Sequence, residues 1–251
     1  MRIHIIACRI FERELGFLAA TSENQVDLTW VGRGLHNTPE KLCARLIGAV
    51  DELYRQMETG ELEHTPDAIV LGYGLCSKAV VGIRCRGIPI VIPRTDDCIA
   101  LFMGSQRRYL EEFAAAKGAY WLNSGWLEQS GRLFDSDDFK RRRWLAYAEK
   151  FGEDNADYLI EVESSWEKNY STLDFIHSDV HDSPDHLRRA SAEAERKGWQ
   201  LRELDGDLRM LRMMTEGTWN EEKFLILKPG ETVAADYSGK KLRAVREGEE
   251  I

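Results

Sequence analysis

Short apolar runs alternate with helix-forming segments along the first half of the chain, and this alternation constrains the fold more than any other feature. The runs with the length and composition of buried strands are residues 2–7, 26–31, 68–72, 88–92 and 119–122. The segments with helical spacing or helix-start residues are 10–20, 39–58 and 98–116. Strands that are joined through helices pair in parallel. The sequence therefore predicts an α/β fold with an open, mostly parallel sheet and flanking helices, a Rossmann-like three-layer arrangement.

The second half shows the same alternation more weakly. Candidate strands are residues 173–176, 199–204 and 223–227, and candidate helices are residues 139–151, 156–168, 184–198 and 207–215. We expect a first α/β unit at residues 1–130, a second, smaller α/β unit at residues 131–238 packed on it, and a flexible tail at residues 239–251. A single sheet that uses both halves is the alternative.

The composition narrows the class of protein. The 251 residues carry a net charge of −9, and an acidic chain repels phosphate backbones, so we expect no nucleic-acid partner. The basic run at residues 140–143 is flanked by aspartates and predicts a solvated helix face. No apolar stretch reaches the roughly 18 residues of a membrane helix, so we expect a cytoplasmic protein without a membrane partner. Thiols stay reduced there, so the five cysteines serve packing, metal binding or catalysis rather than disulfides.

Cys8, Cys76 and Cys98 each come just after a predicted strand. The carboxyl ends of parallel strands share one rim, which is where ligands bind in open α/β sheets. A helix N-terminus lowers the pKa of a cysteine thiol, and neighbouring thiolates repel one another unless a cation lies between them. The rim therefore predicts a metal site, with an iron–sulfur cluster or zinc as the cofactor. Each cysteine alone is better explained as a small buried residue, and their shared position favours a common site.

The other two cysteines are not expected to take part in that site. Cys43 shares helical spacing with Leu46 and Val50, which predicts packing in the core. Cys85 lies in a basic turn before a strand, where an incidental position is favoured over a reactive one.

Four polar residues are candidate partners of the rim cysteines. His36 also follows a strand and is the first choice for a fourth ligand or a catalytic proton-transfer group, the alternative being a hydrogen bond within its own loop. Asp96 and Asp97 directly precede Cys98, where they either cap its helix or act in catalysis by orienting a ligand. Arg94 is a candidate to bind a substrate carboxylate or phosphate, and pairing with either aspartate is the alternative.

A glycine-rich turn, Gly72-Tyr73-Gly74, separates the third strand from Cys76. It lacks the lysine and the spacing of a phosphate-binding P-loop. We interpret it as backbone that must pass close to another group, such as a cluster or a substrate, which makes Tyr73 and Gly74 candidate substrate-binding residues.

Several motifs occur in an order that is typical of one family. They are Leu35–Leu42, Leu71–Cys76, Pro93-Arg94, Asp97-Cys98, Gly104-Ser105, Tyr109, Tyr120-Trp121 and Gly125-Trp126. The chain resembles the bacterial and archaeal domain-of-unknown-function family 1638 over most of residues 1–130, and more faintly to about residue 230. By position, Cys8, Cys76 and Cys98 match the family's cysteines, and His36 matches its Leu-His-Asn motif. The family usually has a histidine where this chain has Asp96.

Members of that family look like companions of corrinoid-dependent methyl-transfer and amine-degrading systems, so the resemblance implies a corrinoid or methyltransferase protein as a partner. We expect a thiolate-ligated metallocentre protein that is an enzyme acting on a small sulfur-, amine- or one-carbon-containing substrate. Three cysteines would leave one iron of a [4Fe–4S] cluster open to substrate, and zinc with His36 as fourth ligand fits the same residues. The alternative is a non-catalytic accessory or small-molecule-binding protein that partners a methyltransferase, and a cysteine-nucleophile transferase ranks third.

Overall fold

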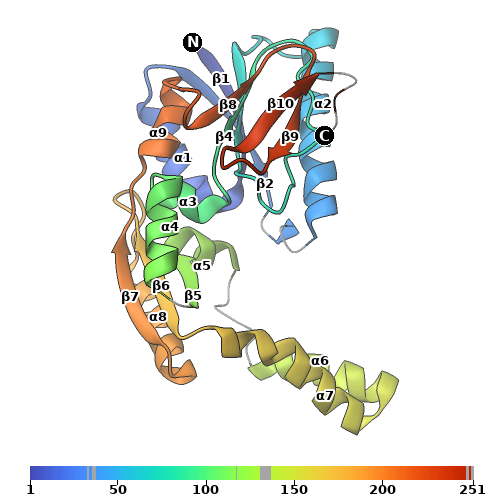
Figure 1. The fold of residues 1–251 in the computed structure, drawn as a ribbon, viewed down its shortest axis with the longest axis vertical. Helices are drawn as coiled ribbons and strands as arrows, with labels where there is room; N and C mark the ends of the chain where they lie inside the picture. Colours follow the sequence, from blue (N-terminus) through green and yellow to red (C-terminus); the bar gives the residue numbers. More distant parts are fainter. Residues whose placement is uncertain (33, 36–37, 117, 131–136, 247–248, 250–251) are drawn as a thin grey trace. The chain divides into compact units, whose positions relative to one another are not determined.

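The apolar runs of the first half form one five-stranded sheet. A computed structural model describes residues 1–251 apart from 33, 36–37, 117, 131–136, 247–248 and 250–251. The strands are β1 (Arg2–Cys8), β2 (Gln25–Val31), β3 (Ala68–Gly72), β4 (Ile90–Pro93) and β8 (Phe224–Leu227), in the order β2-β1-β3-β4-β8. Pairing is parallel except between β4 and β8. The predicted mostly parallel α/β sheet is confirmed (Figure 1).

Helices cover this sheet on both faces, as the three-layer prediction requires. One face carries η1 (Arg9–Phe11), α1 (Glu12–Thr21), the short α3 (Cys98–Phe102) and α9 (Arg209–Glu216). The other face carries α2 (Pro39–Thr59) and the hairpin of β9 (Glu231–Asp236) and β10 (Lys241–Arg246) (Figure 1). The core of this second face includes Leu46 of α2, Ile69 and Leu71 of β3, and Val233 and Leu242 of the hairpin, all buried. All five strand residues of β3 are buried, which explains their continuous apolar sequence.

A second unit contains a three-stranded parallel sheet, β5 (Ala119–Asn123), β6 (Thr172–His177) and β7 (Gln200–Asp205). The helices α5 (Ser124–Ser130) and α8 (Pro184–Lys197) pack with it, and its core includes Leu122, Leu173 and Phe175. Aromatic rings stack beside that core, with the ring of Tyr120 5.7 Å from that of Trp166. Between β5 and β6 the chain also forms α6 (Asp137–Phe151), α7 (Glu153–Ser164) and η3 (Ser165–Asn169).

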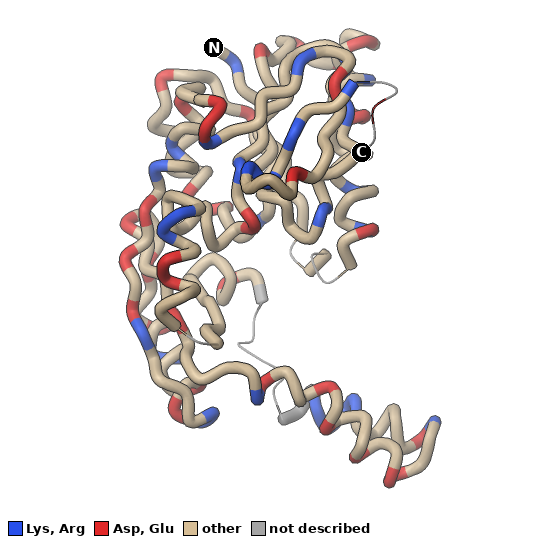
Figure 2. Tube along the Cα trace, in the orientation of Figure 1, with Lys and Arg blue, Asp and Glu red and all other residues tan. Residues whose placement is uncertain are grey.

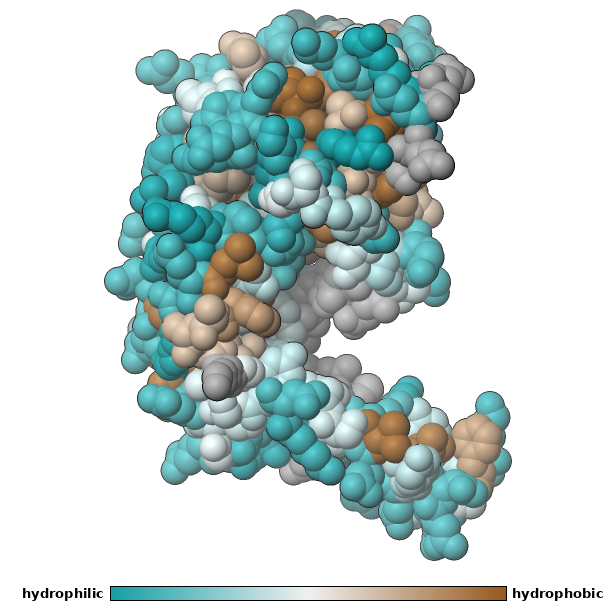
Figure 3. Space-filling model, viewed as in Figure 1, coloured by the Kyte–Doolittle hydropathy of each residue, from teal (hydrophilic) through white to brown (hydrophobic). Residues whose placement is uncertain are grey.

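The α6–α7 hairpin contains the basic run that the sequence placed on a solvated helix face. Acidic and basic positions lie close together along this hairpin (Figure 2), and Arg143 of α6 forms an ion pair with Glu163 of α7. Lys140 pairs with Glu167 of η3 at 3.4 Å. Apolar groups also reach its surface (Figure 3), where Leu145 is exposed.

The boundaries between the units differ from the expected ones. One unit contains residues 1–110, 178–181 and 206–251, and the other contains residues 111–177 and 182–205. The expected boundary at residue 130 missed that α4 (Gln106–Ala115) links the two and that β8 returns to pair with β4. One sheet does therefore use strands from both halves of the chain.

Two further details correct the sequence analysis. The segment expected to be a flexible tail contains β10, which is held by antiparallel pairing with β9 from Lys241 to Arg246. The helix expected at residues 98–116 is two helices, α3 and α4, because the chain turns at Gly104, whose φ of 73° is left-handed. Within the described residues, no helix combines the length and the apolar character that a membrane span requires.

Candidate functional site

The three rim cysteines follow three neighbouring strands. Cys8 is the last residue of β1, Cys76 lies four positions after the end of β3, and Cys98 is the first residue of α3 after β4. Strand order runs outward from β1 to β2 on one side and from β3 to β4 on the other, so the topological switch point lies between β1 and β3. Cys8 and Cys76 thus flank the position at which open α/β sheets bind ligands.

The glycine-rich turn brings these strand ends into close contact. A Cβ atom at Gly72 would lie 2.6 Å from the Cβ of Ala7, next to Cys8. A Cβ atom at Gly74 would lie 2.5 Å from the carbonyl oxygen of Thr95. Only glycine fits at either position, so the turn passes close to Ala7 and Thr95, and an approach to a cluster or substrate stays a prediction.

The side chains at the rim interact with one another. Tyr73 is buried, and its hydroxyl lies close enough to Cys8 for that thiol to contribute to the pKa of Tyr73. Burial raises the pKa of Tyr73 far above its ordinary value, and charges on Cys8, Cys76 and Cys98 raise it further. Burial also raises the pKa of Cys76, with added contributions from Asp97 and Cys8. The three cysteines and Tyr73 therefore lie within electrostatic range of one another.

The expected lowering of a thiol pKa by a helix N-terminus is wrong for Cys98. Burial raises its pKa well above the ordinary value, and the charges of Asp97, Cys76 and Cys8 add to this effect. The helix that Cys98 begins has only five residues, and the carboxylate of Asp97 already occupies its N-terminus. None of the charged groups that shift the pKa of Cys76 or Cys98 in the described structure is positive.

Asp97 caps α3, which is one of the two roles expected from the sequence, the other being to orient a ligand. Its carboxylate accepts a hydrogen bond from the backbone N–H of Ile99 at 2.9 Å. Burial raises the pKa of Asp97, while hydrogen bonds from Ile99, Ala100 and the hydroxyl of Tyr109 act in the opposite direction. Tyr109 is thus a member of the site that the sequence analysis did not select. Its signal in the sequence was its place among the family motifs, eleven residues after Cys98.

Asp96 lies in the same loop but has other partners. Its carboxylate accepts a hydrogen bond from the side-chain amide of Gln106 at 2.7 Å and pairs with Lys241 at 2.8 Å. Its backbone carbonyl accepts a hydrogen bond from the N–H of Cys76, also at 2.8 Å. Asp96 therefore joins the ends of β3 and β4 to α4 and β10, and its carboxylate is bound by Gln106 and Lys241.

Arg94 donates its hydrogen bonds to backbone carbonyls. The acceptors are Glu221 at 3.0 Å, Phe224 at 3.2 Å, Lys240 at 3.3 Å and Leu242. These acceptors differ from the adjacent aspartates expected as one alternative, and binding of a substrate anion by Arg94 stays a prediction. Arg94 binds β8 and the β9–β10 hairpin to the end of β4.

Cys76 begins an unusual turn. Cys76, Ser77 and Lys78 have φ angles of 44°, 57° and 71°, so three consecutive residues with side chains adopt the left-handed conformation. This conformation is unfavourable for such residues. Hydrogen bonds compensate on both sides, because the N–H of Leu75 bonds to Thr95 and that of Ala79 bonds to Leu75. Strained backbone of this kind concentrates at functional sites.

The remaining candidate residues lie elsewhere. His36 lies outside the described residues. Cys43 is half-buried, with its sulfur 3.4 Å from the carbonyl of Val81, so it lies at the edge of the core rather than inside it. Cys85 is fully buried in the core beside Tyr54. The cysteine in this basic turn is therefore inaccessible to solvent.

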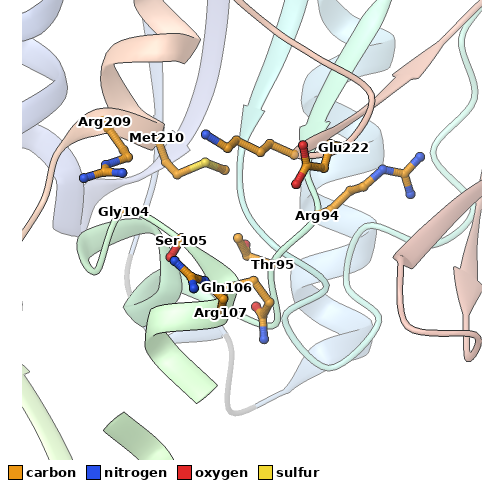
Figure 4. Close-up of a pocket in the computed structure, with 10 residues that line it drawn as sticks. Arg94, Thr95, Gly104, Ser105, Gln106, Arg107, Arg209, Met210 and Glu222 are labelled. Atoms are coloured by element: carbon orange, nitrogen blue, oxygen red, sulfur yellow. The ribbon is translucent and has the colours of Figure 1, made fainter. Parts of the chain in front are cut away.

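A pocket of about 360 Å³ opens at the carboxyl end of β4, beside the loop that leads to Cys98. Figure 4 shows its lining, which comes from Arg94 and Thr95, the turn into α4, the start of α9 and the turn before β8. The guanidinium of Arg94 points away from the other labelled side chains, in agreement with its carbonyl partners. This pocket was not anticipated from the sequence, because it is assembled from four segments far apart in the chain.

The comparisons with known proteins place the chain in a family. The family described as "Protein of unknown function (DUF1638)" matches residues 30–215. The chain belongs to this family. The match to DUF1638 includes Cys76, Cys98, Asp96 and Asp97 and begins after Cys8, so it starts later than the resemblance read from the motifs. Neither the curated proteins nor the solved structures gave a match.

Proposed function

We propose that Cys8, Cys76 and Cys98 together bind a metal centre, an iron–sulfur cluster with zinc as the alternative, which serves chemistry on a small sulfur-, amine- or one-carbon-containing substrate. The observation that supports this most is the placement of the three thiols after three neighbouring strands, at the switch point of the sheet. Their mutual electrostatic interaction adds support, because a cation would relieve it.

Three soft sulfur donors fit an iron–sulfur cluster or zinc. Within the described residues, no set of three or more His, Cys, Asp and Glu side chains is already arranged to hold a metal ion. The proposal therefore requires the thiol side chains to turn toward a common point on binding. The backbone around the thiols is held in place, because Gly72 and Gly74 allow the strand ends to pack closely and Asp97 caps α3.

The surrounding residues have defined tasks in this proposal. Tyr73 is the buried neighbour of Cys8, and Tyr109 holds Asp97 through its hydroxyl. When bound, the centre would supply Lewis-acid or redox chemistry to the substrate. A corrinoid or methyltransferase protein remains the partner that the family resemblance suggests.

The test is metal and sulfide analysis of anaerobically purified protein, with a visible absorption spectrum. We expect bound metal in the wild type and its loss in Cys8→Ala, Cys76→Ala and Cys98→Ala. Cys43→Ala is the matched control, because Cys43 is also half-buried and unpaired by a disulfide. Metal-free wild-type protein, or equal metal loss in Cys43→Ala, would overturn the proposal.

A further variant separates the two cofactors. A cluster held by cysteines alone should survive His36→Ala and keep its broad brown absorption. A zinc site closed by His36 should lose affinity sharply, because one of four bonds disappears. We expect the cluster, and colourless protein with stoichiometric zinc that His36→Ala removes would show that zinc is the cofactor.

A further inference from the structure

The pocket at the end of β4 gathers basic residues in an acidic protein. Arg107, Arg209 and Lys223 line it together with Arg94, against the single acid Glu222, although the chain has a net charge of −9. Arg209 pairs with Asp207 at 2.5 Å. Lys223 forms no ion pair within the described part of the chain, so its ammonium is available to a ligand.

The N-terminus of α4 lies at the same pocket. The side chain of Ser105 accepts a hydrogen bond from the N–H of Arg108 at 3.1 Å, and its carbonyl accepts one from Tyr109 at 3.2 Å. Ser105 therefore caps a ten-residue helix whose first residues, Gln106 and Arg107, line the cavity. The first N–H groups of a helix have no partner within it, and the positive end of the helix dipole favours an anion there.

The hydroxyl of Thr95 is an independent indication of a ligand. Thr95 is 1% exposed, and its Oγ1 has no hydrogen-bond partner among the described residues. The residue nevertheless lines the pocket (Figure 4), and its Oγ1 lies beside Gly74, where a Cβ atom would come within 2.5 Å of it. A buried hydroxyl without a partner destabilises a fold, and such a group in a native structure calls for an explanation.

We propose that this pocket binds the phosphate or carboxylate group of a small molecule, with Lys223, the hydroxyl of Thr95 and the N-terminus of α4 as the recognising groups. Each of these favours an oxyanion for its own reason: a positive charge, a hydrogen-bond donor and a helix dipole. A volume of about 360 Å³ leaves room for more than the anionic group itself. The inference does not depend on a metal at the cysteines, so metal analysis and anion binding can fail separately.

The test is isothermal titration calorimetry of the full-length protein with inorganic phosphate in a buffer of low ionic strength. We expect binding to the wild type and about tenfold weaker binding to Lys223→Gln, because one charge-assisted contact is lost. Lys228→Gln is the matched control, since it makes the same change of charge at an exposed lysine that does not line the pocket. An equal loss in both variants would show a general effect of charge and overturn the proposal.

Thr95→Val tests the hydroxyl and separates a ligand-binding role from a structural one. Removing a hydroxyl that has no protein partner should leave the melting temperature unchanged or higher, while weakening phosphate binding about tenfold. Thr95→Ser restores the hydroxyl and should restore binding. A lower melting temperature with unchanged phosphate affinity in Thr95→Val would contradict the proposal.

Acetate in place of phosphate distinguishes the two ligand sources. Tighter binding of phosphate assigns the pocket to phosphate-bearing molecules, and tighter binding of acetate assigns it to carboxylates. Failure of both anions to bind at millimolar concentration would overturn the proposal.

Discussion

The two parallel sheets of this protein treat their buried ionisable groups in opposite ways. In the five-stranded sheet, the buried Tyr73 and the half-buried Cys76 and Cys98 have raised pKa values, and every charged group among the described residues that shifts these values is acidic. In the three-stranded sheet, Asp174 is fully buried but has the guanidinium of Arg202 at 3.6 Å. His177, at the end of β6, lies between two carboxylates.

The difference indicates which sheet is arranged for a ligand. In the three-stranded sheet, Asp174 and His177 each have an opposite charge of the protein beside them, although burial still raises the pKa of Asp174. For Cys76 and Cys98 in the five-stranded sheet, no positive group among the described residues contributes to the pKa shift, and this favours a site that a cation completes. The contrast can be tested at the buried charge of Asp174 in the three-stranded sheet, at the backbone beside the cysteines of the five-stranded sheet, and at the ion pairs of His177.

The largest effect is expected for Arg202→Leu. It removes the cation from the buried carboxylate of Asp174, and breaking a buried pair on one side costs about 3 kcal/mol of unfolding free energy. Burial already raises the pKa of Asp174, with Arg202 opposing the shift. A raised carboxyl pKa means that the folded state prefers the proton, so the variant should lose more stability at pH ~8 than at pH ~5. Urea unfolding at both pH values measures this.

Two further variants check the assignment. Arg202→Leu combined with Asp174→Asn should recover most of the lost stability, because the buried uncompensated charge is gone and Glu112, the other partner of Arg202 at 2.5 Å, is partly exposed to water. Arg188→Leu breaks an exposed pair with Asp185 and should change stability by less than about 0.5 kcal/mol. A loss in the double variant as large as that in Arg202→Leu would show that packing, and not charge, explains the effect.

Gly72→Ala tests the backbone contact that brings Cys8 and Cys76 together. The new Cβ would meet Ala7 at 2.6 Å, so β1 and β3 must separate, at a cost of about 2 kcal/mol. Gly48→Ala is the control, because a Cβ at that exposed position of α2 meets nothing within 4 Å. It should stabilise the protein by about 0.5–1 kcal/mol. Thermal or urea unfolding of both variants decides whether the contact is as tight as the structure shows.

Most of the sheet could be predicted from the sequence, and the physical reason is local. The run at residues 68–72 is apolar throughout, and the run at residues 119–122 follows the turn residue Gly118. These runs form β3 and β5 with almost the predicted limits. The position of Cys8, Cys76 and Cys98 after strands followed from the same pattern. What the pattern does not contain is the partner of each strand, so the return of β8 to β4 and the pairing of β10 were missed.

The partners of the polar residues at the site were harder to predict. Lys241 binds Asp96 from a distance of 145 positions along the chain, and Arg94 binds carbonyls of the same hairpin. Such contacts depend on tertiary structure and leave no periodic signal. The thiol pKa of Cys98 was predicted with the wrong direction for a related reason: the helix start was read correctly, but burial and Asp97 outweigh it.

Ser77→Gly tests the left-handed turn that follows Cys76. Ser77 is exposed and has a φ of 57°, so removing its Cβ should relieve strain and stabilise the protein by about 1 kcal/mol. Ser165→Gly is the control: with a φ of −62° at this position, the variant should lose about 1 kcal/mol, because glycine adds backbone freedom and removes the hydrogen bond that the Ser165 hydroxyl donates to the carbonyl of Val162 at 2.7 Å. A destabilised Ser77→Gly variant would mean that the turn is not strained.

The smallest effect concerns His177, the charged counterpart of the neutral thiols. Burial disfavours its charge, but hydrogen bonds with Asp182 at 2.5 Å and Glu203 at 2.9 Å outweigh burial and raise the pKa of His177 above its ordinary value. The folded state therefore prefers the protonated ring. The stability that this ring contributes is complete below the unfolded pKa of about 6.5 and disappears as the pH rises through the folded pKa.

His177→Gln should cost about 0.5 kcal/mol of unfolding free energy at pH ~5.5 and almost nothing at pH ~9, and the cost is small because the ion pairs are partly solvated. NMR titration of the His177 ring gives its pKa directly, and a value at or below about 6.5 would show that the two carboxylates do not hold the charge, removing the contrast between the two sheets.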